Sequence, residues 1–146
     1  MSLLKFFFFL PEKEKFTQGI ANEQLIAKVD KLWGDLDELS LILLLGGIAI
    51  GVLIAIIYYT AYNEMPGRHY KVKHWGIGFF VTLLITLLFS AAIEYFGLKT
   101  SIKSGLMSLY CICALNSALY SLIAYLLVSF IWCNCLPTNA YKFLKL

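Results

Sequence analysis

Three long apolar segments, separated by short polar loops, constrain this chain more than any other feature of its sequence. They cover residues 41–62, 75–97 and 106–135, and Glu94 is the only charged residue within them. Each is about as long as the roughly 20 residues that a helix needs to cross the hydrocarbon layer of a bilayer. We therefore predict an all-α integral membrane protein with three transmembrane helices.

The composition leaves little room for a folded unit outside the membrane. Of the 146 residues, 60% are hydrophobic and 14% are charged, which lies outside the range of water-soluble domains. The polar parts are a tail at 1–40, a basic loop at 63–74, a short loop at 98–105 and a C-terminal segment at 136–146. None of them is long enough to bury a core of its own. The net charge of +3 is modest, and we expect no nucleic acid as a partner.

The tail ahead of the first span contains a heptad-like pattern, which we call the tail seam. Its apolar side chains recur at intervals of four, three, four and three residues, which predicts an amphipathic helix over residues 20–40. Because two heptads are too few for an autonomous coiled coil, two interpretations stay open. The helix either docks or oligomerises with a partner, or it lies along the headgroups or over the loops of its own bundle. The tail seam consists of Leu25, Val29, Leu32, Leu36 and Leu39.

Small residues mark a packing face on the first span. Gly47, Gly51 and Ala55 recur every fourth residue, a spacing that allows two helix backbones to approach closely. The pattern fits packing within the chain as well as it fits dimerisation.

The third span carries a second face of small and polar residues, among them Asn116, Ser117 and Ser121. We expect the Asn116 amide to bond to another helix, because an amide inside a membrane requires a hydrogen-bonding partner. Together the spans offer more small and polar surface than three helices need among themselves. This excess favours a multi-subunit assembly.

The second span carries a polar stripe whose members are four residues apart and so share one face of a helix. Thr and Ser at such positions bond to the carbonyl of the preceding turn, and their small size permits close packing. An intramembrane carboxyl also marks ion and proton paths. We favour packing, because Glu94 lies about two turns nearer the interface than the midplane. The polar stripe consists of Gly78, Thr82, Thr86, Ser90 and Glu94.

Basic residues lie on both sides of the predicted spans. Four near the tail oppose five on the other side, so the positive-inside rule does not select an orientation. Because a charged tail of about 40 residues is harder to translocate than one short loop, we expect a cytoplasmic N-terminus, in a bacterial inner membrane. Arg68, Lys71 and Lys73 follow the first turn as a basic collar that suits anionic headgroups or an acidic partner.

The sequence offers little that is typical of catalysis. It shows no phosphate loop, nucleophile triad or paired intramembrane carboxylates. The topology brings His69, His74, Cys133 and Cys135 to one interface, a set that would suit tetrahedral zinc. Against zinc, residues two apart point about 200° away from each other on a helix, and cysteine is an ordinary apolar residue in membranes. We therefore expect no enzyme, metal, cofactor or small-molecule substrate.

Two functions remain. We expect a non-enzymatic subunit of a membrane complex, an anchor or scaffold of a secretion, injection or energy-coupled machine, with lipid and other membrane subunits as partners. The alternative is a homo-oligomeric channel or membrane-permeabilising protein, holin-like or effector, in which the polar stripe from Thr82 to Glu94 lines the pore. A stator-like role beside a proton-carrying partner is a weaker variant of the first function.

Overall fold

The computed structural model of the chain describes residues 23–63, 71–97, 107–138, 140 and 142–146. These residues form three α-helices and no strand. The helices are α3 (Glu23–Asn63), α4 (Val72–Gly97) and α5 (Met107–Cys135). All three are long and apolar enough to span a membrane, which confirms the prediction of a three-span, all-α membrane protein.

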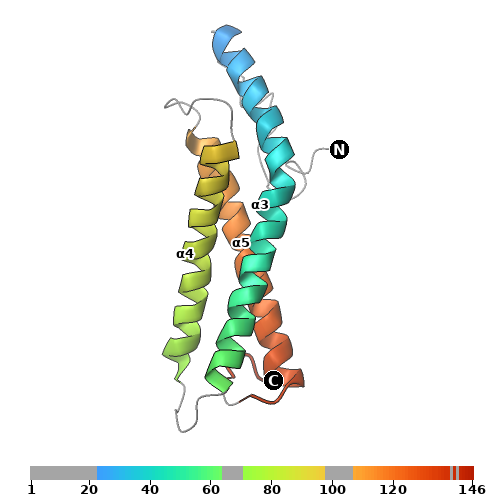
Figure 1. Cartoon of the computed structure of the whole chain (residues 1–146), viewed down its shortest axis with the longest axis vertical. Coiled ribbons are helices and arrows are strands. Elements are labelled where there is room, and N and C mark those ends of the chain that lie inside the picture. Colours follow the sequence, from blue (N-terminus) through green and yellow to red (C-terminus); the bar gives the residue numbers. More distant parts are fainter. Residues whose placement is uncertain (1–22, 64–70, 98–106, 139, 141) are drawn as a thin grey trace.

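The three helices run side by side as an up-down-up bundle (Figure 1). Helices α3 and α5 are parallel, because Gly47 lies against Ser117 and Gly51, one turn further along, lies against Ser121. Helix α4 is antiparallel to both, so that Gly97 at its end meets Leu39 near the beginning of the membrane part of α3. Short loops between consecutive apolar helices produce this topology.

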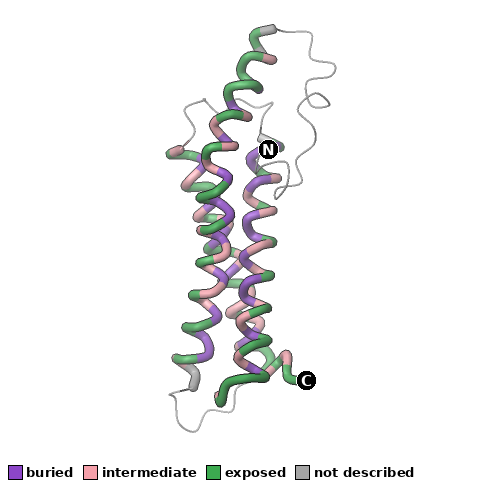
Figure 2. The backbone as a smooth tube through the Cα atoms, turned by 90° about the vertical axis from the view of Figure 1, so that its right-hand side faces the viewer, coloured by how far each residue is buried: buried purple, intermediate pink, exposed green. Residues whose placement is uncertain are grey.

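Buried and exposed positions alternate along each helix of the bundle (Figure 2). Large apolar side chains are exposed on the outside of α4, where Phe80 is 68% exposed and Leu88 is 63% exposed. The interior instead holds hydroxyl side chains from all three helices. Lipid tails are as apolar as leucine, so outward leucines cost nothing in a bilayer, whereas polar and small side chains stabilise contacts between helices.

Two apolar clusters lie at opposite ends of the bundle. The first joins the beginning of α3 to the beginning of α5, with Leu36 packed in one cluster with Leu109 and Tyr110. The second is aromatic and joins the ends of α3 and α5 to the beginning of α4, including Tyr59 and Trp75. Buried hydroxyl side chains, such as those of Thr86 and Ser121, occupy the interior between the two clusters.

Helix α3 is much longer than its neighbours, with 41 residues against 26 in α4. Because Gly97 is level with Leu39, residues 23–38 of α3 extend past the end of α4 by about 24 Å at 1.5 Å per residue. Figure 1 shows this projecting part above the other two helices. From Glu23 onward the tail is one helix with the first span. The beginning of the amphipathic helix expected over 20–40 stays a prediction, since residues 20–22 lie outside the described residues.

The C-terminal segment folds back under the bundle instead of leaving it. The Phe143 ring stacks on the Trp75 indole, with ring centroids 4.3 Å apart, and Leu144 packs against the aromatic cluster. Asn134 Nδ2 donates to the Leu144 carbonyl at 2.9 Å, and the Leu146 amide donates to Asn134 Oδ1 at 3.0 Å. These contacts connect the last residues to α4 and α5 together.

Candidate functional site: the polar interior of the bundle

The polar stripe of α4 faces the interior of the bundle. Thr82, Thr86 and Ser90 are fully buried, and Glu94 is 5% exposed. At Gly78 a Cβ atom would lie only 2.6 Å from the Tyr125 hydroxyl, so the tyrosine side chain of α5 packs directly against this glycine. The stripe is therefore buried within this chain from Thr82 to Glu94, and Gly78 is half-buried.

Hydrogen bonds along the stripe combine the local and the inter-helix kind. Thr82 Oγ1 donates to the Gly78 carbonyl at 2.9 Å, and Thr86 Oγ1 reaches the Thr82 carbonyl at 2.8 Å. In both bonds the threonine hydroxyl donates to the carbonyl four residues earlier in the same helix. Thr86 Oγ1 also lies 2.8 Å from Ser121 Oγ on α5. The stripe thus joins two helices at the middle of the bundle.

Helix α5 presents a complementary row of Ser117, Ser121, Tyr125 and Ser129, again four residues apart. Ser117 Oγ donates to the Leu43 carbonyl of α3 at 2.9 Å. Tyr125 OH donates to the Trp75 carbonyl at 3.2 Å. The row therefore contacts α3 on one side and α4 on the other.

The pattern of small residues predicted only part of this row. It indicated Ser117 and Ser121 as packing residues, but it missed Tyr125 and Ser129. Ser129 Oγ accepts a hydrogen bond of 3.4 Å from the indole nitrogen of Trp75. The four-residue spacing was the available signal, and the large tyrosine in the middle hides it from a search for small residues.

The small-residue face of α3 packs within the chain. A Cβ atom on Gly47 would lie 2.8 Å from Ser117 Oγ, and one on Gly51 would overlap the Ser121 carbonyl. Ala55 is fully buried in the aromatic cluster. Of the two uses that the glycine spacing allows, the structure therefore shows contact between α3 and α5.

Asn116 occupies a half-buried position beside this contact. Its Nδ2 donates to the Ile112 carbonyl one turn earlier at 2.9 Å. That bond lies within α5, whereas we expected the Asn116 amide to bond to another helix.

The tail seam is covered as well. Val29, Leu32 and Leu36 are fully buried in the cluster that includes Leu109 of α5, and Leu39 is half-buried. The Leu25 side chain lies outside the described part of the chain. Oligomerisation through this seam would first require these side chains to leave their present contacts.

Three buried oxygens near the end of the stripe differ from the rest. Glu94 Oε1, Ser90 Oγ and the Tyr110 hydroxyl have no hydrogen-bond partner within the described residues. Tyr110 belongs to the first apolar cluster together with Cys113, and Ile93 packs against that cluster. Buried polar atoms of this kind are uncommon and costly.

The possible zinc ligands do not gather in the part of the chain that the structure describes. No group of three or more His, Cys, Asp or Glu side chains occurs there that could hold a metal ion, and His69 is outside it. His74 Nδ1 accepts a bond from the Lys71 amide at 3.1 Å. Cys133 Sγ lies 3.3 Å from the Tyr59 hydroxyl, whereas Cys135 is exposed.

Of the basic collar, Lys71 and Lys73 are described and both are exposed at the beginning of α4. Arg68 lies outside the described residues. The exposed lysines stand at the same end of the bundle as the aromatic cluster that contains Trp75.

Taken together, these contacts define a polytopic α-helical membrane protein whose polar side chains are used to hold three spans together. Comparisons of the chain with models of protein families, with curated proteins and with solved structures found no match.

Proposed function

We propose that this protein is a non-enzymatic subunit of a larger membrane complex, in which the three-helix bundle is the anchor and the projecting part of α3 holds a partner. The observation that carries the proposal is the length of α3. Its residues 23–38 extend about 24 Å past the level at which α4 ends. A helix that served only to cross the bilayer would not need this extension.

The charges on the projecting part support a docking role. Residues 23–38 include five acidic residues and two lysines, a net charge of −3. Its apolar side is buried in the first cluster, while Lys28, Asp30 and Glu38 are exposed. The partner surface that complements such a helix is basic. The bundle thus holds the helix at a fixed position and leaves its polar side open to a partner.

The same geometry does not favour a channel. For copies of this chain to line a pore with Thr82, Thr86 and Ser90, these buried side chains would have to turn outward. That rotation would break the bond from Thr86 to Ser121.

We further propose that the complex lies in a bacterial inner membrane. The tail then lies in the cytoplasm, because moving the charged tail across the membrane is harder than moving one short loop.

Site-specific photo-crosslinking in the native cell tests this proposal. A photo-reactive residue replaces Lys28 or Lys31 on the projecting helix, and in matched controls it replaces Lys71 or Lys73 at the other end. We expect one defined protein to be crosslinked from the projecting positions and not from the controls. The pair Asp30→Lys and Glu38→Lys should abolish that product. Crosslinks to lipid or to this chain alone at all four positions would overturn the proposal.

A further inference from the structure

The fold-back of the C-terminal segment determines where two lysines lie. Asn134 holds this segment through the Leu144 carbonyl and the Leu146 amide. Phe143 is held by its stacking on Trp75. Lys142 and Lys145 belong to the same short segment, so they are kept beneath the bundle and do not trail away from it.

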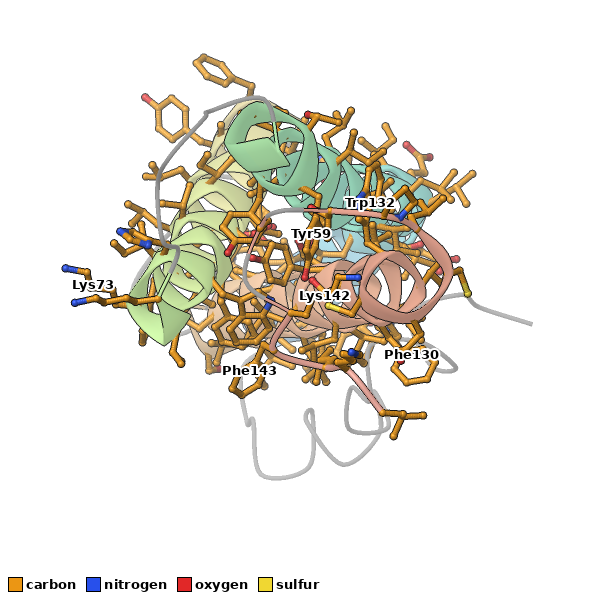
Figure 3. All side chains as sticks on the ribbon, turned by 90° about the horizontal axis from the view of Figure 1, so that it is seen from below. Tyr59, Lys73, Phe130, Trp132, Lys142 and Phe143 are labelled. Atoms are coloured by element: carbon orange, nitrogen blue, oxygen red, sulfur yellow. The ribbon has the colours of Figure 1, made fainter. Side chains whose placement is uncertain are left out.

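These lysines join the beginning of α4 at one end of the molecule. Figure 3 views the bundle from this end and shows Lys73, Lys142 and Phe143 there. Lys71, Lys73 and Lys145 are exposed, and Lys142 is half-buried. Four cationic side chains from two distant parts of the sequence therefore share one end.

Acidic side chains are confined to the opposite end in the part of the chain that is described. The last one on α3 is Glu38, and the one on α4 is Glu94, about one turn before the helix ends at Gly97 beside Leu39. Helix α5 and the described C-terminal residues contain none. Among the described residues, no carboxylate side chain therefore lies at the end that carries the four lysines.

The aromatic residues at this end indicate the depth of the lysines in the membrane. Tyr59 and Trp132 stack with ring centroids 5.6 Å apart, and Trp75 lies in the same cluster. Tyrosine and tryptophan concentrate at the level of the lipid headgroups. Lysines beside them lie where phosphate groups of lipids are found, and anionic lipids attract such clusters.

We propose that this end of the bundle is a binding surface for anionic phospholipid, with Lys71, Lys73, Lys142 and Lys145 contacting the headgroup phosphates. Asn134 and Phe143 act as positioning residues, because they hold the C-terminal segment in place. This surface is independent of the protein partner proposed for α3.

Native mass spectrometry of the full-length protein, purified in a mild detergent, tests the inference. Phosphatidylglycerol and phosphatidylcholine with identical acyl chains are titrated separately, and the bound lipid is counted. We expect the wild type to prefer phosphatidylglycerol. The pair Lys142→Gln and Lys145→Gln should weaken this binding by about fivefold to thirtyfold, with phosphatidylcholine unaffected.

Two sets of variants separate a built surface from simple charge attraction. Lys28→Gln with Lys31→Gln removes the same charge at the opposite end and should leave phosphatidylglycerol binding within about twofold of the wild type. Asn134→Ala and Phe143→Ala keep every lysine but release the segment, and each should lower the binding. The inference is overturned if the Lys142 and Lys145 pair and the Lys28 and Lys31 pair have equal effects on phosphatidylglycerol binding. It is also overturned if the wild type binds both lipids equally, which is the result expected if this end is a site for an acidic protein. Unchanged binding in both positioning variants would overturn their assigned role.

Discussion

Thr86 on α4 and Ser121 on α5 share a hydrogen bond of 2.8 Å between their hydroxyl oxygens, fully buried in the bundle. The two residues belong to faces that look independent in the sequence, one a polar stripe and the other a row of small residues. The structure makes them two halves of one interface. Each face packs against the other, so most polar side chains of the spans are buried within the single chain.

The first prediction concerns the strength of that bond. Thr86→Val keeps the shape of the side chain but removes its hydroxyl, and we expect the free energy of unfolding to fall by about 0.6 kcal/mol, up to about 1.7 kcal/mol. Ser121→Ala should cost a similar amount, and the double variant should cost less than the sum of the two. Unfolding by dodecyl sulfate in mixed micelles measures these values. Thr60→Val is the control, since Thr60 is exposed and its bonds among the described residues go to Ile56 and Ile57 of its own helix. Strict additivity would contradict the contact.

The second prediction concerns the close approach of α3 and α5. Gly51→Ala places a methyl group against the Ser121 carbonyl, so the helices must separate, and we expect a loss of about 1–3 kcal/mol in the free energy of unfolding. Gly76→Ala is the matched control, because a methyl group added there would have no neighbouring atom within 4 Å among the described residues. That variant should be neutral or slightly stabilising. Equal stability of the two variants in the same micelle assay would refute the packing.

The sequence predicts the spans and the polar stripe, but it does not predict how the helices pack. The three spans follow from length and apolarity alone, and the spacing of the polar stripe correctly placed Thr82, Thr86 and Ser90 on one face. Which helix covers that face depends on how the three helices rotate in the bundle. The same spacing suits an intramolecular contact and a pore, so the sequence left both open.

The C-terminal segment shows a different reason for failure. Nothing in the order of residues 136–146 indicates that Phe143 reaches Trp75, about 70 positions earlier in the chain. The contact depends on α4 beginning beside the end of α5, a consequence of the up-down-up topology. In the sequence, Asn134 resembles any polar residue at the end of a span, and only the fold reveals its two bonds to the segment.

The third prediction concerns the carboxyl at the end of the stripe. Glu94 Oε1 is buried without a hydrogen-bond partner among the described residues, so replacing the side chain with an apolar one of similar size removes a destabilising group. We expect Glu94→Met to raise the free energy of unfolding by about 1–3 kcal/mol. Ser90→Ala, which removes a smaller polar group, should produce a smaller rise. A marked loss of stability in Glu94→Met would show that the carboxyl has a stabilising role.

The fourth prediction uses the four free cysteines. Each Cys-x-Cys pair is divided by the helix, with Cys111 and Cys135 exposed and Cys113 and Cys133 buried. We expect two thiols to react rapidly with N-ethylmaleimide in mild detergent, and all four after denaturation in dodecyl sulfate. Intact-mass analysis counts the added groups, and fragmentation locates them. Rapid labelling of Cys133 in the folded protein would contradict its contact with Tyr59.

The fifth prediction concerns the C-terminal segment itself. The Leu146 amide donates to Asn134 Oδ1, so its exchange with deuterium should be slowed in the wild type. In Asn134→Ala this protection should disappear, while amides in the middle of α5 keep theirs. Hydrogen exchange read by mass spectrometry at the terminal peptide measures the difference. Equal exchange in both proteins would mean that the segment is not held.

The mass of the native assembly shows whether this chain is a subunit of a larger membrane complex. The tagged protein is extracted from its own membrane in a mild detergent and weighed intact by native mass spectrometry, with each component then identified. We expect the mass of a defined complex in which this chain and at least one different protein are present in fixed proportion. A mass equal to one copy, or to a ring of this chain alone, would contradict it.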